Sequence, residues 1–95
     1  MSDYRRILQD AAKRGIRYRE DIAERRVGPS SESVAAVEQF EEALTDAGHD
    51  AEMTLAMLDE IGSPASVGMC APRFFGFVIG GSMPVTVATN WLTTA

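Results

Sequence analysis

Residues 63–95 read SPASVGMCAPRFFGFVIGGSMPVTVATNWLTTA and carry a single formal charge, at Arg73. All fourteen acidic residues and the other eight basic residues lie before Ser63. Because the surfaces of soluble domains are usually about 25–35% charged, a stretch this uncharged has to be covered by other protein. The remainder of the chain is too small to provide that cover. We therefore expect the chain to be a piece of a larger protein or half of a tight assembly.

The chain is long enough for one small domain with a modest core, at 95 residues. Its net charge of −5 argues against a general binder of nucleic acids or of membrane surfaces. Residues 1–26 hold eight basic and five acidic residues, whereas residues 27–62 hold nine acidic residues and no basic one. Since these charges alternate with apolar residues at helical spacing, we interpret them as solvated helix faces.

Cysteine and histidine are too scarce for a disulfide or a zinc site. Cys70 is the only cysteine and His49 the only histidine. An absence of disulfides is typical of a reducing, cytoplasmic setting. Residues 1–15 contain no apolar core long enough for a signal peptide. No nucleophile with its base and no pair of carboxylates at a predicted cleft can be identified, so the sequence predicts no catalytic residue.

Apolar spacing predicts three amphipathic helices before Ser63. The first begins at a cap on Ser2 or Asp3 and ends at the Val27–Ser30 turn, where Pro29 disfavours helix in the residue before it. Its apolar stripe stays in phase across Gly15, which favours one continuous helix over two helices broken at that glycine. The stripe comprises Tyr4, Leu8, Ala11, Gly15, Tyr18 and Ile22.

The second predicted helix begins at a cap on Ser30 or Ser31 and stops near Gly48, because glycine suits a left-handed backbone at a helix end. The third begins at a cap on Asp50 and closes at Gly62–Pro64.

The last third of the chain predicts a different pattern. Residues 74–79 are aromatic and β-branched, which indicates a short extended segment. Residues 80–82 break it, and a fourth, apolar helix follows with Pro84 in its first turn. The glycine-rich residues 80–82 could cradle an anion at the helix start, with a plain turn as the alternative. The uncharged run 74–92 is as long as a membrane span, but its polar and helix-breaking residues favour a buried segment.

The residues from Gly62 to Ala95 resemble the N-terminal region of the group II pyridoxal-phosphate-dependent decarboxylases. This family includes the aromatic-amino-acid, glutamate and diaminobutyrate decarboxylases. The most specific matches are PRFFGF at 72–77 and GGSMP at 80–84, while RRVGPS at 25–30 and LDEIGSP at 58–64 fit more loosely. Bacterial members are more similar than animal ones, since Ala71 stands where the animal aromatic-acid enzymes have histidine before proline.

The resemblance implies a mainly α chain that forms the N-terminal part of an aspartate-aminotransferase-type (fold type I) enzyme. Residues 1–62 would be a helical dimerisation segment that packs against the partner subunit of a homodimer. Residues 63–95 would form the rim of the active site and the first helix leading into an absent large cofactor domain. The residues lining the pocket for an L-amino-acid substrate would be Phe77, Val78, Ile79 and Gly80.

The family's chemistry uses a lysine that forms a Schiff base with pyridoxal phosphate, and an acidic partner for the pyridinium nitrogen. Both would lie downstream of this chain, whose only lysine, Lys13, is on a predicted surface helix. We therefore expect no cofactor-binding residue, no metal ligand and no decarboxylase activity from these residues alone. Two other classes remain open, namely a free-standing small helical protein that self-associates through residues 63–95 and a small membrane-associated protein.

Overall fold

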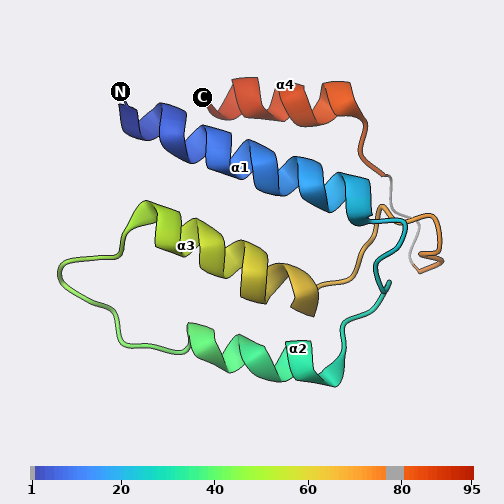
Figure 1. Cartoon of the computed structure of the whole chain (residues 1–95), viewed down its shortest axis with the longest axis horizontal. Helices are drawn as coiled ribbons and strands as arrows, with labels where there is room; N and C mark the ends of the chain where they lie inside the picture. Colours follow the sequence, from blue (N-terminus) through green and yellow to red (C-terminus); the bar gives the residue numbers. More distant parts are fainter. Residues whose placement is uncertain (1, 77–80) are drawn as a thin grey trace.

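The computed structural model describes residues 2–76 and 81–95, and this part of the chain is mainly helical, as predicted. Four α-helices are joined by short helical turns and irregular connections (Figure 1). The α-helices are α1 (Ser2–Asp21), α2 (Ser31–Ala36), α3 (Ala51–Met57) and α4 (Pro84–Thr94). The shorter turns are η1 (Val37–Phe40), η2 (Leu58–Gly62) and η3 (Ser63–Ala65).

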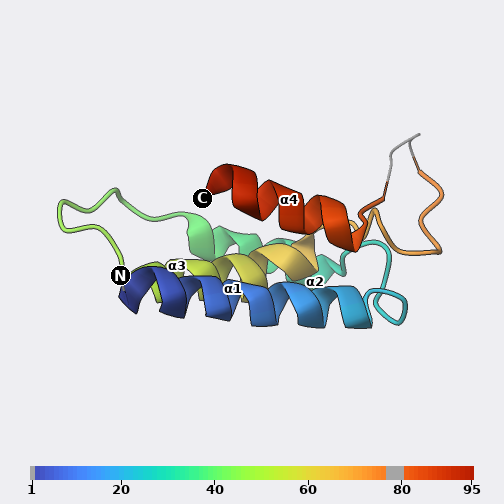
Figure 2. The ribbon, with the colours of Figure 1, turned by 90° about the horizontal axis from the view of Figure 1, so that it is seen from above.

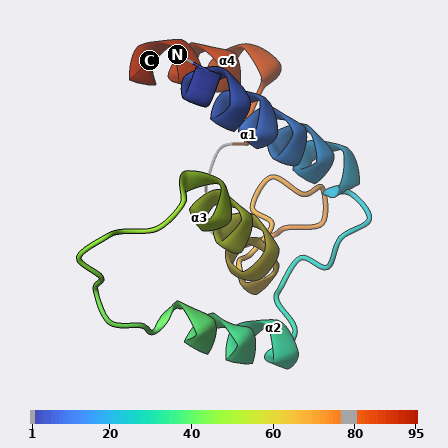
Figure 3. The same ribbon diagram turned by 60° about the vertical axis from the view of Figure 1, so that its left-hand side comes forward.

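The helices lie side by side in the order α4, α1, α3, α2 (Figures 1 and 3). Helix α4 runs antiparallel to α1, and α3 runs parallel to it (Figure 1). Seen from above, α4 is displaced from the line of the other helices (Figure 2). The molecule measures 42 × 34 × 21 Å. Domains normally bury the apolar faces of their helices against other elements.

The described helices leave almost no core between them. Among the described apolar side chains, only those of Ile22 and Ala71 are buried. The Cα radius of gyration is 15.2 Å, against about 12 Å for a compact chain of this length. The accessible surface is 7738 Å² for a mass of 10.3 kDa, against roughly 5,400 Å² for a compact monomer of that mass. The chain therefore exposes roughly 2,300 Å² more than a compact fold would.

Helix α1 confirms the prediction of one continuous helix through Gly15. It already includes Ser2, so neither Ser2 nor Asp3 is its cap. It ends at Asp21, earlier than predicted, where the Glu24 and Arg25 amides both donate to the Asp21 carbonyl (3.0 and 3.1 Å). The chain then turns away towards α2.

The predicted end of the second helix is wrong, and the helix is shorter than predicted. The Ser30 cap is confirmed, because the Ser33 amide donates to Ser30 Oγ at 3.1 Å. However, α2 ends at Ala36 and η1 at Phe40, and residues 41–50 are irregular. A helix here would have an apolar face without cover, and Leu44 is 100% exposed. Gly48 adopts the predicted left-handed conformation (φ 74°), although no helix reaches it.

The third predicted helix has the expected start and a different end. The Asp50 cap is confirmed by the Met53 amide, which donates to Asp50 Oδ2 at 3.2 Å. Helix α3 then widens into the π-type turn η2 and tightens into η3, so the helical path passes Gly62 and ends at Ala65. Pro64 is the second residue of η3 and provides no amide to this last turn.

Helix α4 begins at Pro84 after Met83, as predicted, and the Met83 amide donates to Thr86 Oγ1 at 3.1 Å. The predicted extended segment is not found in its described part, since residues 74–76 form no strand and residues 77–79 lie outside the described ranges. The Phe74 amide donates to the Ala71 carbonyl (3.1 Å) within a turn instead of to a neighbouring strand. Within residues 2–76 and 81–95, every helix is too short or too polar to cross a bilayer.

Truncating Ile22 should destabilise the chain more than truncating any exposed isoleucine. Ile22 is only 5% exposed, whereas Ile16 is 59% exposed. We expect Ile22→Ala to lower the free energy of unfolding by about 2–4 kcal/mol, and Ile16→Ala by about 0.5 kcal/mol or less. Urea unfolding followed by far-ultraviolet circular dichroism measures both. Equal losses for the two variants would contradict the assignment of Ile22 to the core.

Candidate functional site

A groove of about 940 Å³ lies between α1 and α4. Helix α1 contributes its middle part to the groove, and α4 contributes the residues of one stripe. The principal lining residues are Gly15, Ile16, Tyr18, Val87, Trp91 and Leu92. Trp91 is 39% exposed and Leu92 is 80% exposed, so the apolar lining is open to solvent. A groove of this composition is typical of a surface that another protein covers.

Three threonine hydroxyls of α4 are hydrogen-bonded to backbone carbonyls of the same helix. The Thr89 hydroxyl donates to the Val85 carbonyl at 2.7 Å, Thr93 to Thr89 at 2.9 Å, and Thr94 to Asn90 at 2.8 Å. Each hydroxyl is therefore satisfied by the helix's own backbone one turn earlier. These threonines can be covered without leaving an unpaired donor, so α4 tolerates burial against another protein.

Gly15 borders open space on the α1 side of the groove. A Cβ atom added at this position would meet no described atom within 4 Å. The sequence predicts that Gly15 permits a partner helix to come close, and α4 does not fill that space. The room beside Gly15 is available to a helix from outside the described chain.

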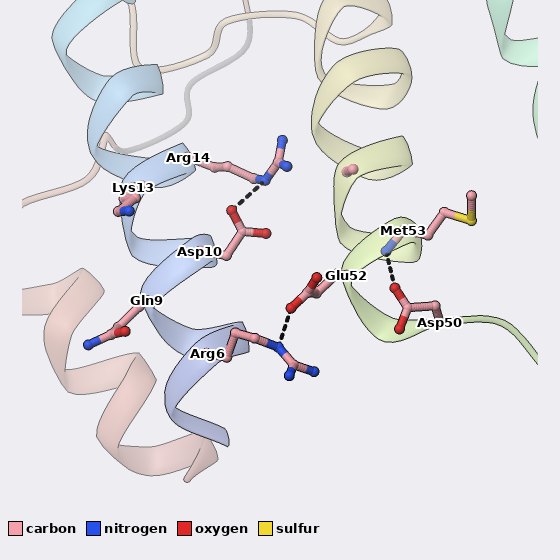
Figure 4. Close-up of a pocket in the computed structure, with 9 residues that line it drawn as sticks. Arg6, Gln9, Asp10, Lys13, Arg14, Asp50, Glu52 and Met53 are labelled. Carbon is pink, nitrogen blue, oxygen red and sulfur yellow. Dashed lines mark hydrogen bonds and ion pairs between the residues drawn. The ribbon is translucent and has the colours of Figure 1, made fainter. Parts of the chain in front are cut away.

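The opposite side of α1 is joined to α3 by charges (Figure 4). Arg6 pairs with Glu52 of α3. Arg14 lies 3.2 Å from Asp10 and 2.7 Å from Asp59 of η2. Figure 4 shows Arg6 reaching towards Glu52, and Asp10 paired with Arg14 on the same helix. The hydrogen bond to Asp59 raises the pKa of the Arg14 guanidinium, so its charge is permanent at any physiological pH.

The cleft between these helices has a volume of about 600 Å³ and is a poor ligand site. Its lining contains three basic residues, Arg6, Lys13 and Arg14, and three acidic ones, Asp10, Asp50 and Glu52. Since the charges balance and Arg6, Arg14, Asp10 and Glu52 are paired across or along the helices, the cleft attracts neither anions nor cations. We interpret it as the contact that aligns α1 with α3.

A set of hydrogen bonds joins the C-terminal end of α1 and the turn that follows it to residues 63–73. We name this set the α1-end clamp. It consists of Arg25, Ser63, Gly68 and Arg73. Arg25 Nη1 donates to Ser63 Oγ at 2.9 Å, and Arg25 Nη2 donates to the Ser63 carbonyl. The Gly68 amide donates to the Val27 carbonyl at 2.9 Å. Arg73 Nη2 donates to the carbonyls of Ala23 (3.3 Å) and Arg25 (2.9 Å).

The two buried apolar residues of the described ranges, Ile22 and Ala71, lie beneath the α1-end clamp. A Cβ atom on Gly68 would lie 3.0 Å from Ile22 Cδ1, so a larger residue there would require the Ile22 side chain to shift. The Arg25 guanidinium carbon lies 5.1 Å from the centre of the Tyr18 ring, a cation–π contact. Partial burial, with a smaller effect from Cys70, raises the pKa of the Tyr18 phenol. The ring therefore stays neutral at neutral pH beneath the arginine.

The substrate-binding residues predicted from the sequence, Phe77, Val78, Ile79 and Gly80, lie outside the described residues. Lys13 is exposed on α1, as predicted. The predicted loop histidine, His49, is partly exposed, with Nε2 2.9 Å from Glu42 Oε1. Cys70 is half-buried beside Tyr18. No group of three histidine, cysteine, aspartate or glutamate side chains in the described ranges could hold a metal ion.

Sequence reasoning missed the α1-end clamp. Its partners are separated by 38 to 50 positions, so no local pattern connects them. One signal was available, because Arg73 is the only charged residue after Glu60. A lone charge in an uncharged stretch indicates a specific partner.

Comparison of the chain with protein-family models, with curated proteins and with solved structures finds no match in any of the three.

If self-association of the chain covers the groove, a charge placed in the groove should weaken that self-association. Val87 lines the groove, whereas Val85, on the same helix and also exposed, does not. We expect Val87→Glu to weaken self-association of the chain at least about tenfold, because the carboxylate would lose its water, and Val85→Glu to change it less than about twofold. Light scattering across a wide concentration range measures this. A sharp monomer peak at every concentration, or equal effects of the two variants, would contradict the expectation.

Proposed function

We propose that this chain is the N-terminal segment of a cytoplasmic pyridoxal-phosphate-dependent amino-acid decarboxylase of fold type I. Its role is to pack across the homodimer and to supply part of the rim of the substrate pocket. The motifs at 72–77 and 80–84 support the family assignment. The lack of disulfides supports a reducing compartment.

The observation that carries the proposal is the excess of exposed surface. Each chain exposes roughly 2,300 Å² more than a compact monomer, so a pair of chains has roughly 4,600 Å² to cover, within the range of about 2,000–5,000 Å² in total that an obligate dimer buries. The exposed apolar side chains of α1 and α4 lie on both sides of one groove. Such a surface suits a segment that folds as part of a larger assembly.

Each part of the chain has a role in this proposal. Residues 1–62 pack against the partner subunit. Residues 77–80 lie at the L-amino-acid substrate. The apolar helix α4 packs onto the large cofactor domain, and its back-bonded threonines suit that burial.

The described residues do not fit pyridoxal phosphate. Lys13 is exposed and lines the charge-balanced cleft, where Asp10 and Glu52 are already paired with arginines. A cofactor lysine instead needs a site that holds the phosphate and excludes water. The cofactor belongs to the remainder of the enzyme, and no step of its chemistry is assigned to these residues.

A free-standing helical protein that self-associates is the second candidate, and the open groove favours it as well. The two candidates differ in what the rest of the assembly is. A second copy of the same 95 residues would complete the self-associating protein, whereas the decarboxylase requires a large domain in addition.

The reading frame that contains this chain should encode an active decarboxylase. We expect its full product, supplied with pyridoxal phosphate, to release carbon dioxide from at least one amino acid in a panel of L-amino acids. The residues 1–95 alone should release none. If the full product releases none with any amino acid, and the groove still drives self-association, the second candidate replaces the first.

Gly80 tests the proposed rim. In the active full-length protein, Gly80→Val should lower kcat/KM at least about tenfold, because a side chain would occupy the space next to the substrate. Gly81→Val is the matched control, since a Cβ atom at Gly81 meets no described atom within 4 Å. The thermal unfolding midpoint should be the same for both variants. Unchanged kinetics for Gly80→Val would remove this residue from the rim.

A further inference from the structure

We infer that the groove between α1 and α4 is the docking surface for a second copy of this chain, with the α4 of each copy covering the α1 of the other. The two α1–α4 pairs together form a four-helix bundle. Within the decarboxylase this inference rests on the proposed homodimer, and it goes further by naming the surfaces that meet. For a free-standing protein that self-associates, the same surfaces meet.

Helix α4 is the segment of this chain whose surface suits the groove. Among the described α-helices, it alone carries no charged residue. The hydroxyls of Thr89, Thr93 and Thr94 donate to carbonyls within α4, so covering them leaves no unpaired donor. The groove that receives this helix is lined mainly by apolar residues. An uncharged helix enters such a groove without taking a charge out of water.

The charges of α1 decide which helix lies over it. Helix α1 contains six basic and four acidic residues, whereas α4 contains none. Removing a charge from water costs free energy unless the charge gains a partner. A dimer with α1 against α1 would bring the charges of two such helices together, and a dimer with α4 against α1 brings only those of one. The second arrangement is therefore favoured.

Small residues along the groove allow a second helix to come close. Ala12 and Gly15 line it on α1, and Ala88 lines it on α4. A Cβ atom at Gly15 would meet no described atom within 4 Å. Packed helices lie about 8–10 Å apart, and small contact residues allow the shorter distances. The groove therefore offers room for helix contact at its centre.

The direction of the helices fits a two-fold assembly. Helix α4 runs antiparallel to α1 within one copy (Figure 1). A two-fold axis parallel to the helices keeps their direction, so the α4 of one copy is antiparallel to the α1 of the other as well. Each helix then has antiparallel neighbours, as in an up-down-up-down bundle. A two-fold contact uses the same surface on both copies, so both grooves are covered at once.

The exposed area supports a second copy as the occupant. A pair of chains has roughly 4,600 Å² to cover, which is within the range that obligate dimers bury. Docking in the groove also leaves part of α4 uncovered. Val85 and Thr89 are exposed and do not line the groove. That face of α4 remains for the large domain of the proposed decarboxylase.

Cross-linking between two differently labelled chains tests the arrangement. Both chains carry Cys70→Ala, which removes the only native cysteine. One chain also carries Gly15→Cys, and the other Ala88→Cys. With a short bis-maleimide, we expect the mixture to give at least about fivefold more cross-linked dimer than either chain alone, because helices in contact are closer than helices on a bundle diagonal. Lys13→Cys in place of Gly15→Cys is the matched control, since Lys13 lies on α1 outside the groove. It should give only the background yield.

Gly15→Leu provides a second measurement without labels. Leucine favours helix more than glycine does, so α1 is retained while the close approach is blocked. In sedimentation equilibrium, we expect the dimer dissociation constant to rise at least about tenfold for Gly15→Leu and less than about twofold for Lys13→Leu.

Three results would overturn the inference. They are a wild type that stays monomeric at every concentration, equal effects of the two leucine variants, and a Gly15→Cys chain that cross-links to itself as well as it does to the Ala88→Cys chain. Carbon dioxide release by the full-length product is measured on the wild type and tests the proposed function separately. An active product with any of these three results keeps the proposed function and loses this docking surface. An inactive product with the expected cross-links loses the decarboxylase and keeps the docking surface.

Discussion

The constraint on which this structure depends is that its described helices bury little apolar surface against one another. Helix α1 has neighbours on both sides, α3 and α4 (Figure 1). Apolar side chains therefore remain exposed along most of α1 and α4, and burial is confined to Ile22 and Ala71 where residues 63–73 fold back over the end of α1. Among the described residues, nearly complete burial of apolar side chains is limited to these two, although such burial normally dominates folding.

Because burial is so limited, polar contacts determine the arrangement. Arg6 and Arg14 align α1 with α3 and η2 through Glu52 and Asp59. Arg25 and Arg73 attach residues 63–73 to the end of α1. Such contacts are directional but individually weak in water. They specify where each described segment lies.

Local signals in the sequence were sufficient for some elements and not for others. The caps at Ser30 and Asp50 and the start of α4 at Pro84 depend on residues within one helical turn, so they could be predicted. The length of α2 could not, because the pattern around Leu44 predicts an apolar face without indicating whether anything covers it. The α1-end clamp depends on pairs far apart in sequence. The four predicted rim residues lie outside the described ranges, so they stay predictions.

Three surfaces of α1 differ in their chemistry. One side carries the arginines that face α3, the other carries Gly15 and Ile16 in the open groove, and the end carries Ile22 under Gly68. A partner that covers the groove contacts α1 without disturbing the arginine contacts or the clamp. Since α1 is a continuous helix, its end moves with its middle. Whatever holds α1 therefore also holds residues 63–73, which Arg25 and Arg73 tie to the turn that follows it.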